Sequence, residues 1–295
     1  MGQYLAPETG LEQTGFWRKI LAHPSYDTYW SEQAMDRVLA AQPLKTPVML
    51  IHGLWDQEDI YGAPAVYKAL EPKDKANDMV FLVLGPWFHG QVSRDGNNLG
   101  AIRFNFDTAL AFRREVLRPF LASRLKDGAG KAATPPVYAF ETGTSRWLSL
   151  DSWPSGGRDK GAVHARPLYL KAGLKLDFNA PSAGDAEFDE YVSDPAKPVP
   201  YRARPIVPGN YDNGQAWSRW LTDDQRMASG RPDVLAYVSE VLTEPLKISG
   251  EPVVNLTAST SGTDSDWVVK LIDLYPDAVY GQPEMGGYQL MVAAD

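Results

Sequence analysis

Cysteine is absent from the 295-residue sequence, which excludes disulfide bonds, thiolate metal sites and a cysteine nucleophile. Long apolar runs are also missing, and none approaches the roughly 20 residues that a membrane-spanning helix needs. Basic residues are in the minority, because 29 Lys and Arg stand against 37 Asp and Glu, giving a formal net charge of −8. Without a basic stripe the chain has no electrostatic means of binding nucleic acid or an anionic membrane. We therefore expect neither as a partner.

Apolar and aromatic residues are plentiful, at 44% hydrophobic residues with 9 Trp and 14 Tyr, and the length favours two domains. In the first half, two short apolar runs at residues 47–53 and 79–84 have the length and continuity of buried parallel strands. The amphipathic stretches 63–70 and 107–126 are predicted to be helices, one after each of these strands. A strand, helix, strand, helix order is typical of an α/β fold with a parallel sheet.

The flanking regions differ from this pattern. Residues 1–42 read as helical and aromatic, with a second helix predicted over 31–41 from an N-cap at Ser31. After about residue 128, Pro, Gly and Asp interrupt short runs of β-branched and aromatic residues, which predicts a β-sandwich or jelly roll. The runs are residues 137–141, 167–170, 234–238, 252–257 and 267–272. The Gly-rich stretch 155–161 is the best candidate for a linker.

Two ionisable residues follow the two predicted strands. Asp56 lies three positions after Gly53, and His89 ends the sequence Gly-Pro-Trp-Phe-His that begins at Gly85. Taken separately, they read as a turn aspartate and a loop histidine. Because one strand–helix–strand crossover separates them, both side chains are expected at the same edge of the sheet. This is how an α/β-hydrolase mounts the acid and the base of a Ser-Asp-His triad.

Other histidines fit the role of base less well. His52 lies at the boundary between strand and turn, where we expect it to pack. No acid is expected to orient His23 or His164.

Glu58 and Asp59 form a carboxylate cluster with Asp56. Like charges so close repel one another unless a cation lies nearby. One interpretation is therefore a subsite for a substrate ammonium group, and the other is an acidic N-terminus for the helix at 63–70. No metal-ligand spacing is present, and we expect neither a metal nor a cofactor. The neighbouring rings of Trp55, Tyr61 and Trp87 fit either a pocket wall or core packing.

A nucleophile for the triad is missing. No Gly-x-Ser-x-Gly motif occurs, and only Ser25 and Ser31 precede Asp56, neither in a strand–turn–helix context. The order Ser, Asp, His would put the serine before Met1. The alternating pattern at 290–295 also reads as an unfinished strand, so we expect a fragment of a longer protein.

These motifs resemble the α-amino acid ester hydrolases, within the wider group of cocaine-esterase-like hydrolases, glutaryl acylases and X-Pro dipeptidyl peptidases. The resemblance runs along essentially the whole chain. The string Trp-Asp-Gln-Glu-Asp within 53–59 is specific to the ester hydrolases, whereas the histidine motif at 85–89 is shared more broadly. Residues 23–30 resemble the end of a helical cap, and 231–237 and 261–272 resemble the opening strands of a jelly roll.

The resemblance implies a domain division and a function. Residues 1–42 would be a cap remnant, 43–154 the C-terminal part of an α/β-hydrolase domain, and 155–295 a partial jelly-roll sandwich. Asp56 and His89 would be the triad acid and base. Glu58 and Asp59 would bind the substrate's α-ammonium group, and the full-length protein would transfer the acyl group of an α-amino acid ester or amide to water or to a β-lactam amine.

The resemblance also implies a homo-oligomer that is secreted or periplasmic, and a fragment that is inactive without its serine. Two alternatives stay open. The same fold serves X-Pro dipeptidyl peptidases and glutaryl acylases, and a β-rich half with exposed rings could instead be a non-catalytic binding module.

Overall fold

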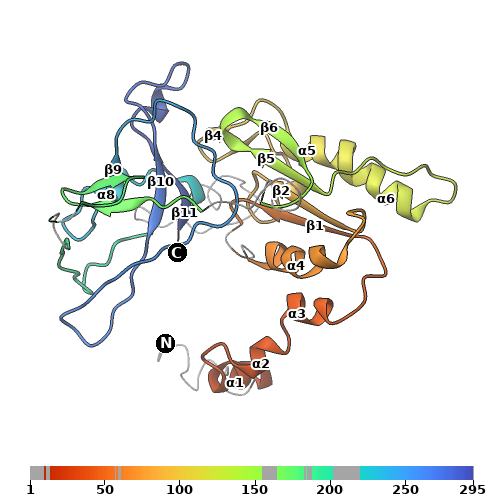
Figure 1. The fold of residues 1–295 in the computed structure, drawn as a ribbon, viewed down its shortest axis with the longest axis horizontal. Helices are drawn as coiled ribbons and strands as arrows, with labels where there is room; N and C mark the ends of the chain where they lie inside the picture. The colour runs from red at the N-terminus through yellow and green to blue at the C-terminus, as the bar shows by residue number, and fades with distance from the viewer. Residues whose placement is uncertain are drawn as a thin grey trace.

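The computed structural model describes residues 10, 14–56, 58, 61–154, 165–182, 184, 188–201 and 220–294. Figure 1 shows a central sheet with helices on both faces, a second β-rich region beside it, and three short helices that extend away from one face. Within these residues no helix is long and apolar enough to cross a membrane.

The central sheet has the strand order β1-β2-β5-β6. Its first three strands are parallel, and β6 pairs antiparallel with β5. The strands are β1 (Val48–Gly53), β2 (Val80–Gly85), β5 (Val137–Glu141) and β6 (Arg146–Leu150). The predicted strands at 47–53 and 79–84 are confirmed. The run 137–141, grouped by its pattern with the β-rich half but placed within 43–154 by the resemblance, belongs to this sheet.

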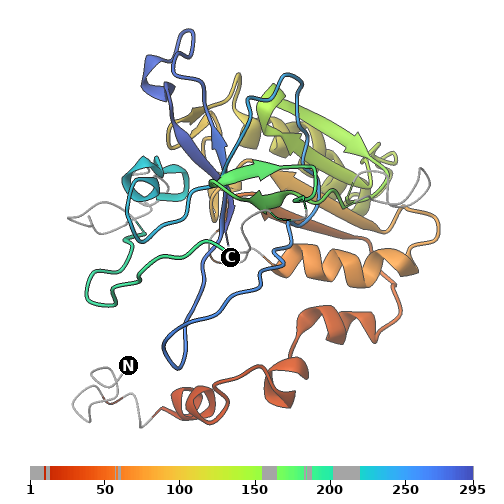
Figure 2. The same ribbon diagram turned by 60° about the vertical axis from the view of Figure 1, so that its left-hand side comes forward.

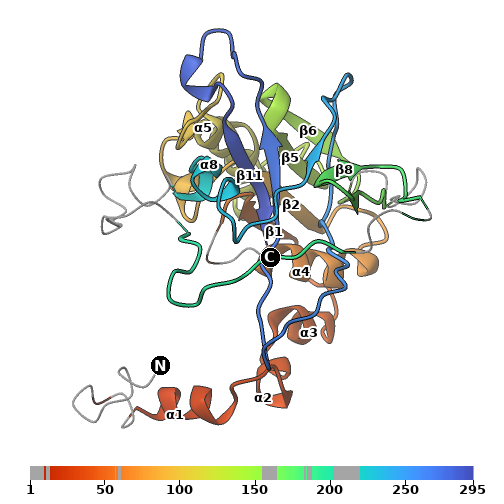
Figure 3. The ribbon, with the colours of Figure 1, turned by 90° about the vertical axis from the view of Figure 1, so that its left-hand side faces the viewer.

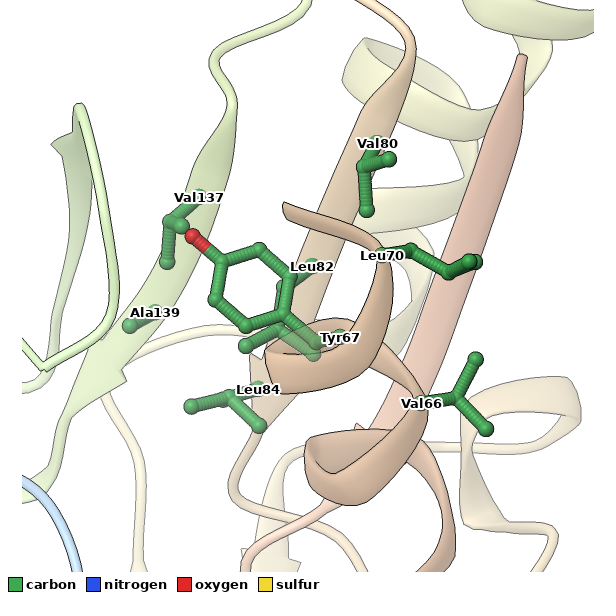
Figure 4. Close-up of a cluster of buried hydrophobic side chains, with 8 residues drawn as sticks. All are labelled: Val66, Tyr67, Leu70, Val80, Leu82, Leu84, Val137 and Ala139. Atoms are coloured by element: carbon green, nitrogen blue, oxygen red, sulfur yellow. The ribbon is translucent and has the colours of Figure 1, made fainter. Parts of the chain in front are cut away.

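Helix α4 (Gly62–Leu70) covers one face of the sheet and confirms the helix predicted at 63–70. Tyr67 and Leu70 of α4 pack on Leu82 and Val137, all at most 4% exposed (Figure 4). Alternate residues of β2 point to this face because side chains alternate along a strand. The buried cluster comprises Val66, Tyr67, Leu70, Val80, Leu82, Leu84, Val137 and Ala139.

The opposite face of the sheet is covered by the segment predicted as a helix at 107–126. It runs as α5 (Thr108–Phe112), a π-helical turn (Arg113–Leu117) and α6 (Arg118–Leu125) without a break. The wider turn precedes Pro119, whose missing N–H cannot bond to the previous turn and whose ring would crowd it. Here Phe112 and Val116 pack against Val83 of β2.

A buried carboxylate fixes the start of β2. Asp74 is 2% exposed and accepts hydrogen bonds from the backbone N–H groups of Met79 and Val80, each at 2.8 Å. A short 3-10 turn, Glu71–Lys73, precedes it at the end of α4. These bonds set where β2 begins and therefore where it ends beside β1.

The N-terminal helices are shorter than predicted. They are α1 (Gly15–Ala22), α2 (Thr28–Ser31) and α3 (Met35–Ala40). Helix α3 packs against α4, whereas α2 and α1 extend away from the sheet (Figure 2). The helix predicted over 31–41 is present only at Met35–Ala40, and its predicted N-cap is wrong, because Ser31 is the last residue of α2. Asp27 is the N-cap of α2, because its side chain accepts a hydrogen bond from Tyr29 N.

The C-terminal region is β-rich but has short strands. One sheet has the order β7-β8-β9, and β10 and β11 form an antiparallel hairpin that lies beside the central sheet (Figure 3). The strand predicted at 252–257 is wrong, since this stretch is irregular and Val253 is 79% exposed. The linker candidate 155–161 lies outside the described residues. The strands are β7 (Tyr169–Lys171), β8 (Lys175–Asp177), β9 (Val238–Ser239), β10 (Lys270–Leu274) and β11 (Gln289–Ala294).

The remaining elements are short. They are the hairpin of β3 (Asn98–Leu99) with β4 (Ile102–Arg103), helix α8 (Arg226–Ser229), and 3-10 turns at Gln91–Ser93, Thr142–Thr144, Trp220–Thr222 and Pro283–Met285.

Candidate active site

Strands β1 and β2 end level with each other, at two glycines. Their parallel register pairs Gly53 with Gly85. Neither position has room for a side chain, because a Cβ on Gly53 would lie 2.4 Å from the carbonyl oxygen of Trp87 and one on Gly85 would lie 2.3 Å from its indole. Trp87 therefore packs directly on both strand ends, and the two following turns begin at the same height.

Backbone hydrogen bonds join the two turns. Leu54 N donates to Gly85 O at 2.8 Å, and Trp55 N donates to Trp87 O at 3.1 Å. The next residue of the first turn is Asp56, and two residues further along the second turn comes His89. The ladder of the sheet thus continues into the turns and carries these two side chains to the same point.

The side chains of Asp56 and His89 face each other. His89 Nδ1 lies 3.1 Å from Oδ2 and 3.3 Å from Oδ1 of Asp56. The aspartate side chain is 10% exposed and the histidine side chain 37%. An Nδ1–H directed at a carboxylate fixes the ring and makes Nε2 the nitrogen able to accept a proton. The pair can therefore act as a base oriented by an acid.

Glu58 lies on the other side of the imidazole. Its Oε2 is 3.7 Å from His89 Nε2, and its backbone N–H donates to Asp56 Oδ1 at 2.9 Å. The Glu58 side chain is 40% exposed. Helix α4 has no acidic residue in its first turn, so Glu58 does not serve as the acidic helix start that the sequence also allowed. Asp59 lies outside the described residues.

A cavity of about 370 Å³ opens at this point. Asp56 and His89 line it, and most of its other walls are apolar or backbone. Its volume lies within the range of small-molecule sites, and its walls combine a few polar groups with apolar ones. The other lining residues are Ile51, His52, Gly53, Gly62, Ala63, Trp87, Phe88, Gly90 and Val92.

Comparison with protein families agrees with this geometry. The model of the X-Pro dipeptidyl-peptidase C-terminal non-catalytic domain matches residues 129–291, more than half of the chain. The model of the X-Pro dipeptidyl-peptidase (S15 family) matches residues 4–91, which include Asp56 and His89. The chain belongs to the X-Pro dipeptidyl-peptidase (S15) family. The resemblance to this group of serine hydrolases is thus confirmed.

Several known proteins are similar to this chain over most of its length. A cocaine esterase of Rhodococcus sp. (strain MB1 Bresler) is 27% identical over 268 residues, which are 88% of this chain. A solved α-amino acid ester hydrolase is 54% identical over 98% of the chain, with a TM-score of 0.91. A solved aminopeptidase from a marine sediment Thaumarchaeota archaeon is 51% identical over 99%, also with a TM-score of 0.91. These matches confirm the predicted fold, part of an α/β-hydrolase sheet followed by part of a β-sandwich.

The chain spans less than half the length of these relatives. The aligned part is 43% of the cocaine esterase, 47% of the ester hydrolase and 46% of the aminopeptidase. More than half of each relative therefore has no counterpart in this chain. The sequence contains no Gly-x-Ser-x-Gly motif, the turn on which an α/β-hydrolase mounts its serine.

Of the other histidines, His52 lines the same cavity as the Asp56–His89 pair, and His23 belongs to the N-terminal helices. His52 is 7% exposed at the end of β1, in agreement with a packed residue. His23 does have an orienting acid, contrary to the sequence analysis, because its Nδ1 lies 2.7 Å from Asp27 Oδ2. That contact belongs to the turn between α1 and α2, where a residue four positions along the chain returns to the ring. His164 lies outside the described residues.

The sequence left open whether Trp55, Tyr61 and Trp87 form a pocket wall or pack in the core. Trp87 is 1% exposed, lines the cavity with part of its surface, and packs on Phe112 of α5. Trp55 packs on the cluster around Phe88, and Tyr61 is 65% exposed. Core packing therefore describes Trp87 and Trp55 best.

Two buried polar residues near His89 escaped the sequence analysis. Gln91 and Thr108 are 3% and 0% exposed, and both hydrogen-bond to the loop that carries the histidine. No motif marks them, although a Gln directly after His-Gly in an apolar context is a weak signal. In the described part of the chain, no three His, Cys, Asp or Glu residues are grouped to hold a metal ion.

Proposed function

We propose that the whole protein containing this chain is a serine hydrolase that acts on α-amino acid esters through an acyl-enzyme. Asp56 is the triad acid, His89 is the base, and the serine comes from outside these 295 residues. The observation that carries the proposal is the 3.1 Å contact between His89 Nδ1 and the buried carboxylate of Asp56 at the edge of a parallel sheet.

The chemistry follows from the orientation of the imidazole. Nε2 of His89 removes the hydroxyl proton as the serine oxygen forms a bond to the ester carbonyl carbon. The imidazolium, stabilised by Asp56, then gives that proton to the departing alcohol as the carbon–oxygen bond of the ester breaks. In the second half, His89 takes a proton from water as the water oxygen attacks the acyl carbon, and the imidazolium then returns that proton to the serine oxygen as the acyl–serine bond breaks and the acid is released. A β-lactam amine in place of water would give acyl transfer.

Recognition of the substrate's α-ammonium group falls to Glu58 and Asp59. Glu58 supports this role because its carboxylate is partly exposed and lies 3.7 Å from His89 Nε2, next to where the acyl group must bind. A cation within about 4 Å of a partly buried carboxylate gains roughly 4 kcal/mol of Coulomb energy at an effective dielectric constant of about 20. The 54% identity to an α-amino acid ester hydrolase favours the same substrate class.

A second candidate is an aminopeptidase, favoured by the 51% identity to a solved aminopeptidase. Both substrate classes present an α-ammonium next to the scissile carbonyl, so Glu58 would serve either one. They differ in the leaving group, which is an alcohol or an amine. The proposal keeps the division of the chain into a cap remnant (1–42), a hydrolase segment (43–154) and a partial jelly roll (155–295). The Asp56–His89 pair lies in the hydrolase segment.

The test compares esters with and without the amine. In the whole protein, Glu58→Gln is expected to lower kcat/KM for phenylglycine methyl ester by about tenfold or more, equivalent to at least about 1.4 kcal/mol. Hydrolysis of phenylacetic acid methyl ester, which lacks the amine, should change little. The matched control is Glu240→Gln, which removes the same charge at an exposed position in the β-rich region.

Three outcomes separate the alternatives. Equal hydrolysis of both esters by the wild type would contradict recognition of the amine and leave a general esterase. Faster turnover of phenylglycine amide than of the methyl ester would favour the aminopeptidase. Hydrolysis that continues at the wild-type rate after His89→Ala would contradict the serine hydrolase itself.

A further inference from the structure

The loop that follows β2 carries His89 between two buried side chains. Trp87, two residues before the histidine, is 1% exposed, and Gln91, two residues after it, is 3% exposed. Gly90 between them adopts a left-handed conformation with φ of 75°, which turns the chain sharply behind the imidazole. The loop is therefore held on both sides of the histidine.

Gln91 holds the loop through its amide group. Its Oε1 accepts a hydrogen bond from Phe88 N at 3.1 Å, and its Nε2 donates to Asp95 O at 3.0 Å and Asn98 O at 2.8 Å. The backbone N–H of Gln91 also donates to Phe88 O at 3.0 Å. One N–H and two carbonyls can be satisfied only by an amide in this orientation, since a carboxylate has no donors.

Trp87 is held from the other direction. Its Nε1 donates to Thr108 Oγ1 at 3.0 Å, and that hydroxyl donates to Gly96 O at 2.9 Å. Thr108 is fully buried, so its hydroxyl acts as a relay between the indole and the backbone. Gly96 N in turn donates to Asp107 Oδ1 at 3.0 Å, the carboxylate that caps α5.

Both sets of hydrogen bonds end at one turn, residues 95–98. This turn packs tightly on the start of α5, because a Cβ on Gly96 would lie 2.5 Å from Ala109 N. The turn is therefore a fixed reference point for the loop. Gln91 ties to it directly, and Trp87 ties to it through Thr108.

We propose that Gln91 and Thr108 are positioning residues that set the location of His89 through the turn at 95–98. The inference rests on the proposed role of His89 as the base. Asp56 orients the ring through Nδ1 but does not fix the height of the loop above the sheet. A shift of about 1 Å in a catalytic group can cost about 100-fold in rate, so a base on a loop needs such anchors.

Two variants in the whole protein remove the anchors separately. Thr108→Val keeps the shape of the side chain but removes the relay between Trp87 and Gly96. Gln91→Met keeps the length and loses all three side-chain hydrogen bonds. Thr108→Ser is the conservative variant that retains the hydroxyl. Gln225→Met is the control, since Gln225 is a 2% exposed glutamine that accepts from Lys270 Nζ and donates to Asp223 O in the β-rich region.

Two readouts distinguish positioning from mere stability. The first is kcat and KM for phenylglycine methyl ester, measured well below the melting temperature of each variant. The second is the rate of covalent labelling by a fluorophosphonate, which reports activation of the serine by His89 whatever the preferred substrate. Thr108→Val and Gln91→Met are each expected to lower kcat and the labelling rate by about 10- to 100-fold with KM within about twofold.

Thr108→Ser should restore the rates to within about threefold of the wild type, and Gln225→Met should lower the melting temperature but neither rate. Unchanged labelling in both folded anchor variants would overturn the positioning role, as would an equal loss in Gln225→Met. If one anchor variant does not fold, the other carries the test alone. Wild-type labelling without hydrolysis of the amino ester would refute the proposed substrate class but leave the positioning role intact.

Discussion

The carboxylate of Asp56 lies 3.1 Å from Nδ1 of His89, although 33 residues separate them in the chain. The contact arises because β1 and β2 pair in parallel with Gly53 opposite Gly85, so both strands deliver their turns to one edge. The contact uses Nδ1 of the imidazole, so Nε2 stays able to accept a proton. The geometry is thus that of an imidazole oriented by a carboxylate, as in the acid and base of a Ser-Asp-His triad.

Asp56→Asn in the whole protein should lower kcat for ester hydrolysis by about 10³- to 10⁴-fold. The amide is nearly isosteric, but it can donate to Nδ1 and so favour the tautomer that carries its proton on Nε2. The measurement is steady-state hydrolysis of phenylglycine methyl ester, with circular dichroism to check folding. Asp127→Asn, at an exposed position after α6, is the control and should have no effect. Retention of more than a tenth of the activity by Asp56→Asn would contradict the assignment.

Much of this site could be predicted from sequence because its geometry follows from two apolar runs and their endings. An unbroken apolar run such as 79–84 is typical of a strand buried on both faces, and Gly85 marks where it ends. Once both strands are placed in one crossover unit, the meeting of Asp56 and His89 follows from parallel pairing. Local pattern and global fold agree here.

The anchors of the loop could not be predicted, because no sequence motif marks either the bonds of Gln91 to nearby backbone groups or the bond of Thr108 to a distant side chain. Thr108 meets the indole of Trp87 across 21 residues, a contact that leaves no periodic trace in the sequence. The strand predicted at 252–257 is wrong for a different reason. Its β-branched residues have strand propensity, but propensity yields a strand only where a neighbouring strand pairs with it and buries it.

Acid should weaken the β-rich region through Asp224. Burial acts to raise the pKa of this carboxyl, but hydrogen bonds from the Arg226 side chain and from the backbone N–H groups of Arg226 and Gln289 outweigh it, so the pKa is lowered. Because the folded pKa lies below the unfolded value of about 3.9, the stabilisation is present above that pH and is lost as pH falls through the folded pKa.

The expected result is a melting temperature of the whole protein that exceeds that of Asp224→Asn at pH 7, with a difference that shrinks below about pH 4. Asp266→Asn, which changes an exposed aspartate of the same region, should show no such pH-dependent difference. A gap between wild type and Asp224→Asn that stays constant from pH 7 to pH 3 would refute the linkage.

Gly85→Ala tests whether the close approach of Trp87 sets the height of the two turns. The added Cβ would meet the indole at 2.3 Å, and Trp87 is fixed by its hydrogen bond to Thr108 and by its packing on Phe112. Something must therefore move, and overpacking of this kind costs about 1–3 kcal/mol of stability. Because Trp87 lies two residues before His89, ester hydrolysis should fall together with stability.

Gly62→Ala is the matched control for this substitution. Gly62 begins α4 and lines the same cavity, but a Cβ there meets nothing within 4 Å. Its stability should stay within about 0.5 kcal/mol of the wild type, as for most unobstructed sites. The measurements are the melting temperature and the rate of ester hydrolysis of Gly85→Ala and Gly62→Ala. If Gly85→Ala is as stable and active as Gly62→Ala, then Trp87 yields easily, and its contact with the strand ends does not determine where His89 lies.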